Sequence, residues 1–114
     1  MSSPVEAVQA QVDAFNARDA AAFTACYHPE ATVVGPDGNV MVEGSEAINA
    51  LYAKVFAQSR DLHVNILARI SIGDWVIDEE GASGFVFEGF PTDMHAVVIY
   101  RVSDGLIVRS QVLT

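Results

Sequence analysis

The second half of the sequence consists of strand-like segments, and this constrains the fold more than any other feature. Four such segments run between turn residues, at 62–72, 75–87, 94–103 and 106–113. Gly73-Asp74 and Asp104-Gly105 are typical of tight hairpin turns, so the segments that they join are expected to pair as antiparallel neighbours. A sheet with an apolar face needs a second layer to cover it.

The first half has the periodicity of helices. Ser3-Pro4-Val5-Glu6 is typical of a helix start, and apolar residues then recur every three or four positions as far as Phe15. Asp19 is expected to cap a second, short helix. His28-Pro29 is expected to end that helix, because a residue before proline is pushed out of helical geometry. These 29 residues therefore predict a helical hairpin.

A short β-hairpin and a third helix are predicted between this helical hairpin and the four strands. The strands cover 31–34 and 39–43, with a turn at 35–38, and Ser45 is expected to cap the helix. The fold class predicted is α+β: a cone of three helices packed on one face of a strongly curved, mostly antiparallel sheet.

Length and charge exclude several classes of protein. The 114 residues suit one domain, 1–114, at roughly 150 residues per domain. The net charge of −9 would repel a phosphate backbone and an anionic membrane surface, so we expect no nucleic acid and no membrane partner. The only cysteine, Cys26, cannot form an internal disulfide, and no signal segment is visible at the N-terminus, so we expect a cytoplasmic protein.

Alternation along the first long strand predicts which carboxylate faces the core. Its apolar set, from Leu62 to Ile72 in steps of two, is expected to face the helices. A two-residue turn at Gly73-Asp74 then sets Ala68 against Glu79, which points Glu79 inward. Burial would raise the pKa of that carboxyl toward neutrality, so Glu79 is the predicted catalytic acid or base. A one-residue bulge would exchange Glu79 with its two neighbours, and pairing with a buried donor would give it a structural role instead.

The same parity predicts a pocket lined by apolar residues with a few polar groups, as small-molecule sites usually are. The predicted substrate-binding residues are Gln11, Tyr52, Trp75, Met94, Val98, Tyr100 and Ser110. The alternative is a core filled by side chains, in which the hydroxyl groups only satisfy one another.

The other face of the sheet is expected to carry a polar network beside an apolar pair. The residues placed there are His63, Arg69, Asp78, Glu80, His95, Val97 and Ile99. A twofold homodimer through this face is the preferred interpretation. We expect no metal there, because the spacing of the histidines is not that of metal ligands and Arg69 competes for the carboxylates. No nucleotide, redox or hydrolase motif is present, so no cofactor is expected.

Several segments resemble one known superfamily. They are Val12 to Asp19, Tyr27 to Val33, Glu43 to Ile48, and Tyr100 to Ile107. Together they resemble the nuclear transport factor two-like superfamily, in particular its ketosteroid isomerase and SnoaL-like polyketide cyclase branch. The resemblance implies the cone-shaped fold and dimerisation through the sheet face, and it leaves the chemistry open.

The resemblance also places the residues that ketosteroid isomerases use. Those enzymes move a proton with a carboxylate, while a tyrosine and a protonated aspartate hold the oxyanion. The base falls on Gly35, the tyrosine on Gln11 and the aspartate on Val98, so steroid isomerisation by that mechanism is not expected. A third-helix tyrosine that supports the oxyanion network is matched by Tyr52.

Three functions remain open from the sequence. The first is an enzyme without cofactor that isomerises, cyclises or hydrates a hydrophobic small molecule, with proton transfer at Glu79 and an oxygen held by Tyr52, Tyr100 and Gln11. The second is a module that binds such a molecule without turnover. The third is a dimerisation or partner-binding domain whose cone is filled by side chains.

Overall fold

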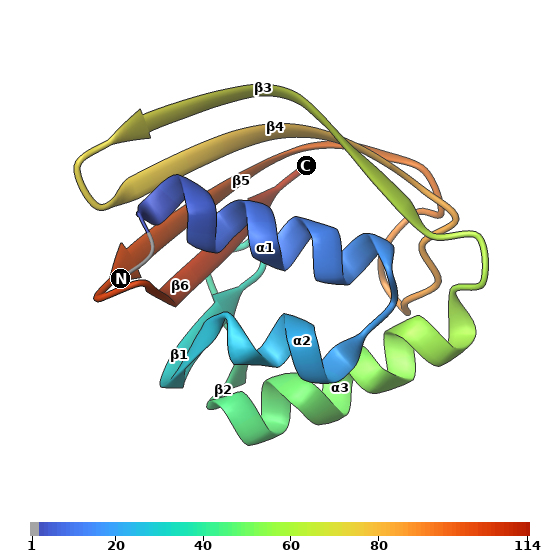
Figure 1. Ribbon diagram of the computed structural model, residues 1–114. Helices are drawn as coiled ribbons and strands as arrows, with labels where there is room; N and C mark the ends of the chain where they lie inside the picture. The colour runs from blue at the N-terminus through green and yellow to red at the C-terminus, as the bar shows by residue number, and fades with distance from the viewer. Residues whose placement is uncertain (1–2) are drawn as a thin grey trace.

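The computed structural model describes residues 3–114, which form three helices and one six-stranded sheet (Figure 1). The helices are α1 (Pro4–Asn16), α2 (Ala20–Ala25) and α3 (Ser45–Gln58). The strands are β1 (Tyr27–Val34), β2 (Val40–Glu43), β3 (His63–Ile72), β4 (Trp75–Ser83), β5 (Met94–Ser103) and β6 (Leu106–Leu113). The predicted α+β class and the order of elements are confirmed.

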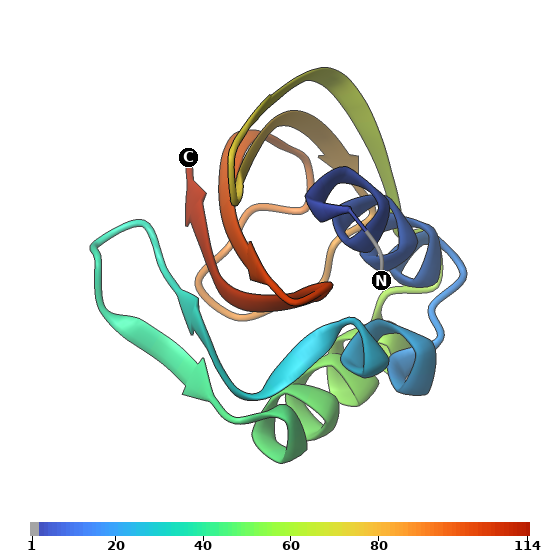
Figure 2. The ribbon, with the colours of Figure 1, turned by 60° about the vertical axis from the view of Figure 1, so that its left-hand side comes forward.

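The sheet is curved and unclosed, and its strand order is β2-β1-β6-β5-β4-β3. All neighbours are antiparallel except β1 and β6, which run parallel. Figure 2 shows the long strands curling around α1, with α2 and α3 beyond it. Within residues 3–114, no helix is both long and apolar enough to cross a membrane.

The first two helices begin where the sequence predicts. The Ser3 hydroxyl accepts from the Glu6 N–H while the Glu6 carboxylate accepts from the Ser3 N–H, so α1 starts with a capping box. Asp19 caps α2 through the Ala22 N–H. At its other end α1 is tied to β3, because the Asn16 amide exchanges two hydrogen bonds with the Val64 backbone.

Two predicted helix boundaries are wrong. The second helix ends at Ala25, and His28-Pro29 lies inside β1 instead of ending the helix. The pairing of β1 with β6 is irregular between Tyr27 and Thr32, and proline is tolerated at such an irregular stretch of a strand. The third helix has Gly44 as its N-cap, with no side-chain hydrogen bond, so Ser45 is its first residue and not its cap.

The fourth strand is shorter than predicted, since it stops at Ser83 and not at Phe87. Gly84 has φ +70°, and a Cβ there would lie 2.3 Å from the Asp61 carbonyl oxygen. The chain therefore turns away from the sheet where its backbone meets the backbone of the segment before β3. The Ser59 hydroxyl accepts from the Val86 N–H and anchors the loop that follows.

A bulge in β3 decides which side chains enter the cone. The pairings Ile72 with Trp75, Ile70 with Ile77, and Ala68 with Glu79 are those that the turn predicts. The next pair is Ile66 with Glu80, so Leu67 is an extra residue in β3. The inward set of β3 changes parity there: Val64 is buried, whereas Ile70 is 55% exposed and Ile72 is 67% exposed. The prediction that Ala68, Ile70 and Ile72 face the helices is wrong for this reason.

Candidate functional site

A cavity of about 110 Å³ lies between the concave face of the sheet and the helices α1 and α3. Its lining is mostly apolar and includes all three tyrosines and four of the six phenylalanines of the chain. The polar lining residues are Gln11, Tyr27, Tyr52, Glu80, Tyr100 and Ser110. An apolar lining with a few polar groups is typical of a small-molecule site.

Glu80 is the acidic group of the cavity lining. Its neighbours in the sheet are Ile66 on β3 and Ala96 on β5, and only 8% of the residue is exposed. The Tyr100 hydroxyl donates to its Oε2 over a long 3.4 Å, and Oε1 has no hydrogen-bond partner within residues 3–114. Burial raises the pKa of Glu80 to about 7; the Asp78 carboxylate adds to the rise, while Tyr100 and Arg69 oppose it.

The three tyrosines stay neutral hydroxyl groups at physiological pH. Burial, with a smaller contribution from the charge of Glu80, raises the pKa of Tyr52 to about 12. Burial raises the pKa values of Tyr27 and Tyr100 well above their usual range. Gln11 is 6% exposed, and its Oε1 is buried without a hydrogen-bond partner among the described residues. A buried acceptor left unpaired costs about 1–3 kcal/mol, so this amide is open to a donor.

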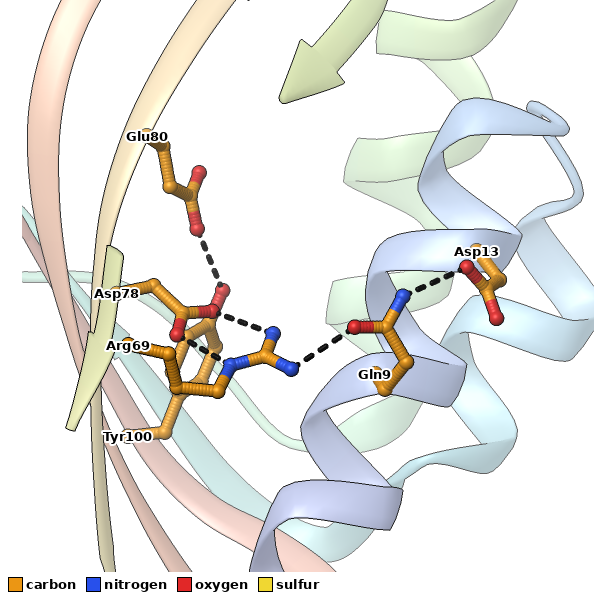
Figure 3. A network of polar contacts seen from close by, with 6 residues as sticks. All are labelled: Gln9, Asp13, Arg69, Asp78, Glu80 and Tyr100. Atoms are coloured by element: carbon orange, nitrogen blue, oxygen red, sulfur yellow. Dashed lines mark hydrogen bonds and ion pairs between the residues drawn. The ribbon is translucent and has the colours of Figure 1, made fainter. Parts of the chain in front are cut away.

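Beside Glu80, a second inward carboxylate is fully paired (Figure 3). Asp78 is 0% exposed and accepts two hydrogen bonds from Arg69, at 2.6 Å to Nε and 2.9 Å to the terminal Nη2. The other terminal nitrogen of Arg69 donates to the Gln9 side chain on α1 at 2.8 Å, and Gln9 in turn donates to Asp13. The Arg69 guanidinium is thus bound to Asp78, and Glu80 has no charged partner at hydrogen-bond distance in the described part of the chain.

A groove of about 580 Å³ lies at the mouth of the cavity. Four side chains line both spaces: Met41, Leu51, Phe87 and Phe90. The acidic residues of the groove are Asp37, in the turn between β1 and β2, and Glu88, in the loop after β4. A molecule that travels from the groove to Glu80 therefore passes Phe87 and Phe90.

The structure brings six of the seven predicted pocket residues together. The residues that line the cavity are Gln11, Tyr52, Met94, Val98, Tyr100 and Ser110. Trp75 does not line the cavity, so its predicted placement is wrong. It is 41% exposed, and the centre of its ring lies 5.9 Å from the Arg101 guanidinium carbon. Of the positions that ketosteroid isomerases use, Gln11 and Val98 line the cavity, while Gly35 lines the groove at its mouth.

The predicted position of Glu79 is wrong, and the bulge explains the error. Glu79 points to the outer face of the sheet, where its Oε2 lies 2.6 Å from His95 Nε2 and where its side chain is 42% exposed. The inward carboxylates of β4 are its two neighbours, Asp78 and Glu80. Arg69, Asp78 and Glu80 were predicted on the outer face and all point inward, whereas His63, His95, Val97 and Ile99 keep the predicted outer parity.

Several lining residues were missed from the sequence. Tyr27 was read as part of a helix end, and Phe85 and Phe87 as part of β4; they and Phe90 line the cavity. The inward position of Glu80 could have been inferred from β5, where Met94, Ala96, Val98 and Tyr100 were correctly predicted to point inward. Ala96 pairs with Glu80 in the sheet, and paired residues point to the same face. Within residues 3–114 no cluster of three His, Cys, Asp or Glu side chains has metal-binding geometry.

Comparison with known proteins finds a family match over most of the chain. The model of the SnoaL-like domain family matches residues 8–110. No curated protein matches the chain.

Solved structures with the same fold are numerous, and three illustrate the range. An uncharacterised cystatin-fold protein from Novosphingobium aromaticivorans has a TM-score of 0.89 and 22% identity, with 100% of both chains covered. A computationally designed 17-OHP binder has a TM-score of 0.82 and 25% identity, covering 99% of this chain and 94% of its own. A putative SnoaL-like polyketide cyclase from Jannaschia sp. CCS1 has a TM-score of 0.80 and 21% identity, covering 96% of this chain and 83% of its own.

Proposed function

The chain belongs to the SnoaL-like domain family, and we propose that it is an acid–base enzyme that acts on a small hydrophobic molecule in its cavity. The proposed reaction class is isomerisation, cyclisation or hydration without a cofactor. Glu80 takes the catalytic role that the sequence suggested for Glu79. The hydroxyls of Tyr52 and Tyr100 and the amide of Gln11 are proposed to hold the substrate.

The observation that carries this proposal is the state of the Glu80 carboxyl. A proton-transfer group works best when its pKa lies near the working pH, and the pKa of Glu80 is about 7. At neutral pH both forms are populated, so the same group can remove a proton and return it. The Tyr100 hydroxyl orients the carboxyl through Oε2, which leaves Oε1 for the substrate.

The cavity volume limits the size of the substrate. An apolar cavity of about 150 Å³ is enough to bind benzene, and this cavity measures about 110 Å³. A molecule of about one ring is therefore the upper limit for the cavity, and the lining side chains must move slightly to admit it. A longer substrate would extend between Phe87 and Phe90 into the groove.

Proton transfer can be tested before the substrate is known. Small cyclic ketones and phenols are first screened for binding by thermal shift, and each binder is then incubated with the protein in D₂O. We expect deuterium incorporation into at least one binder with the wild type and with Glu79→Gln, and none above background with Glu80→Gln. Glu79→Gln is the matched control, because it removes the adjacent carboxylate of the outer face. Incorporation that survives in Glu80→Gln would refute the assigned role.

The alternative function is binding without turnover, and the apolar lining favours it as the second candidate. A binding module would show ligands with similar affinity for the wild type and for Glu80→Gln, and no deuterium incorporation with either. A computationally designed protein of similar fold is a 17-OHP binder, which supports this alternative.

We also propose that the protein is a homodimer through the outer face of the sheet. That face exposes Ile70, Ile72 and Trp75, and an outer hollow includes Val97 and His95. Apolar side chains gathered on an exposed sheet are typical of an interface. Light scattering at micromolar concentration should give twice the chain mass, and Val97→Glu should reduce it to one chain, with Ala53→Glu on α3 as the control. A monomeric wild type would refute the dimer.

A further inference from the structure

The path from solvent to Glu80 carries negative charge only. Asp37 and Glu88 line the groove at the mouth, and Glu80 lies in the cavity beyond it. Neither the cavity nor the groove has a lysine, arginine or histidine in its lining within residues 3–114. The whole chain has a net charge of −9, so the potential along this path favours cations.

The nearest cation inside the cone does not neutralise Glu80. Arg69 gives two hydrogen bonds to Asp78 and a third to Gln9, and it does not line the cavity. Within the described residues, the Glu80 carboxylate therefore lacks a hydrogen-bonded charge partner. A buried carboxylate without a partner is costly, so a cation that reaches Oε1 would stabilise its ionised form.

Two acceptor oxygens of the cavity lining have no donor within residues 3–114. They are Oε1 of Glu80 and the amide oxygen of Gln11, a residue that is only 6% exposed. A ligand that completes these two contacts must bring hydrogen-bond donors. The charge of the path and these two open acceptors are independent observations that lead to the same ligand chemistry.

The walls of the cavity also suit a cation. Tyr27, Tyr52 and Tyr100 line the cavity together with Phe15 and Phe85, so a bound group is surrounded by aromatic rings. Aromatic faces attract ammonium groups by roughly 0.5–2 kcal/mol, and more strongly when water is excluded. The same rings can also pack against the apolar part of a ligand.

We propose that the ligand of this cavity is a protonated amine with a compact apolar body of about one ring, its ammonium group bound to the Glu80 carboxylate. This inference rests on the proposed function, because it uses the same cavity and the same carboxyl. It adds the charge of the substrate class. A carboxylate anion of the same size is disfavoured, because it would meet the ionised form of Glu80 with no cation in the cavity lining within residues 3–114 to offset the repulsion.

Three probes that share one ring test the charge class: benzylamine, benzyl alcohol and benzoate. Their affinities are measured by calorimetry at pH 8, where benzylamine is protonated and Glu80 is mostly ionised. We expect benzylamine to bind the wild type and Glu79→Gln about tenfold more tightly than benzyl alcohol, as a charge-assisted hydrogen bond replaces a neutral one. Benzoate should bind most weakly. In Glu80→Gln the advantage of the amine should disappear, while the affinity for benzyl alcohol stays within about twofold.

The outcomes separate this inference from the proposed function. Equal binding of the amine and the alcohol by the wild type, or tighter binding of benzoate, overturns the charge class and leaves the acid–base role of Glu80 in place. An amine preference that persists in Glu80→Gln overturns the assignment of the ammonium group to Glu80. Binding of none of the probes overturns the inference as well, and the deuterium experiment then judges the proposed function by itself.

Discussion

Replacing Glu80 with glutamine should stabilise the protein at high pH, because it removes a buried carboxylate without changing the shape of the side chain. Glutamine resembles the protonated form of Glu80, and its amide oxygen can still accept from the Tyr100 hydroxyl. The effect should depend on pH in a way that is set by the difference between the folded and unfolded pKa values.

The sign and size of the effect follow from the pKa. The folded state raises the pKa of Glu80 from 4.5 to about 7, so it binds the proton more tightly than the unfolded chain does. The stability that this proton contributes is present below about pH 4.5 and is lost as the pH rises through about 7. At about 1.4 kcal/mol per pKa unit, the loss is about 3 kcal/mol above pH 8. Glu80→Gln should avoid this loss and should match the wild type near pH 4.5.

Urea unfolding from pH 4.5 to pH 9 measures this difference. With a slope of roughly 1–3 kcal/mol per molar urea, the midpoint of Glu80→Gln should exceed that of the wild type by about 1–3 M at pH 8 and coincide with it at low pH. Glu79→Gln serves as the control, because exposed ion pairs such as Glu79–His95 contribute about 0–1 kcal/mol. Parallel stability curves for the wild type and Glu80→Gln would refute the buried, unpaired state of this carboxyl. A pH dependence that Glu79→Gln removed would refute it as well.

Two further substitutions test the architecture around the site. Arg69→Met should destabilise the fold by about 3–5 kcal/mol, because it leaves Asp78 buried without its cation. Adding Asp78→Leu to the same chain should restore most of this loss. A double-mutant cycle of urea unfolding measures the coupling between the two residues, and additive losses would contradict it. Gly84→Ala should destabilise the fold by more than about 1–3 kcal/mol, because φ is +70° and the new Cβ would lie 2.3 Å from the Asp61 carbonyl oxygen. Gly38→Ala is the control for backbone strain alone, because Gly38 has φ +83° and a Cβ there would meet no atom within 4 Å. Equal losses at the two glycines would show that the close approach to Asp61 has no energetic weight.

The elements of the fold could be predicted because local signals mark them. Ser3, Pro4 and Glu6 specify the start of α1, and Gly73-Asp74 and Asp104-Gly105 specify the hairpins. The end of β4 was missed because it depends on a contact between distant segments. It is set by the approach of Gly84 to Asp61, which no local pattern contains.

The face of the sheet to which a residue belongs was predictable on β5 but not on β3. The inward residues of β5 were assigned correctly, from Met94 to Tyr100 in steps of two. On β3 the apolar pattern does not distinguish the two faces, because Ile70 and Ile72 lie on an outer face that is itself apolar. The one trace of the bulge is the run Ile66-Leu67-Ala68, where the alternation with polar residues lapses.

The two inward carboxylates of β4 have different environments, because β3 places one cation opposite them. Arg69 is paired with Asp78 in the register that the turn sets, so both side chains point into the cone and bond to each other. The bulge at Leu67 then reverses the alternation, so that Val64 is buried and Ile66 pairs with Glu80; without it, Asn65 and His63 would follow Arg69 into the cone. Arg69 is one cation for two acids. Asp78 takes it through two hydrogen bonds, and Glu80 is left as the carboxyl whose charge depends on pH and on what occupies the cavity.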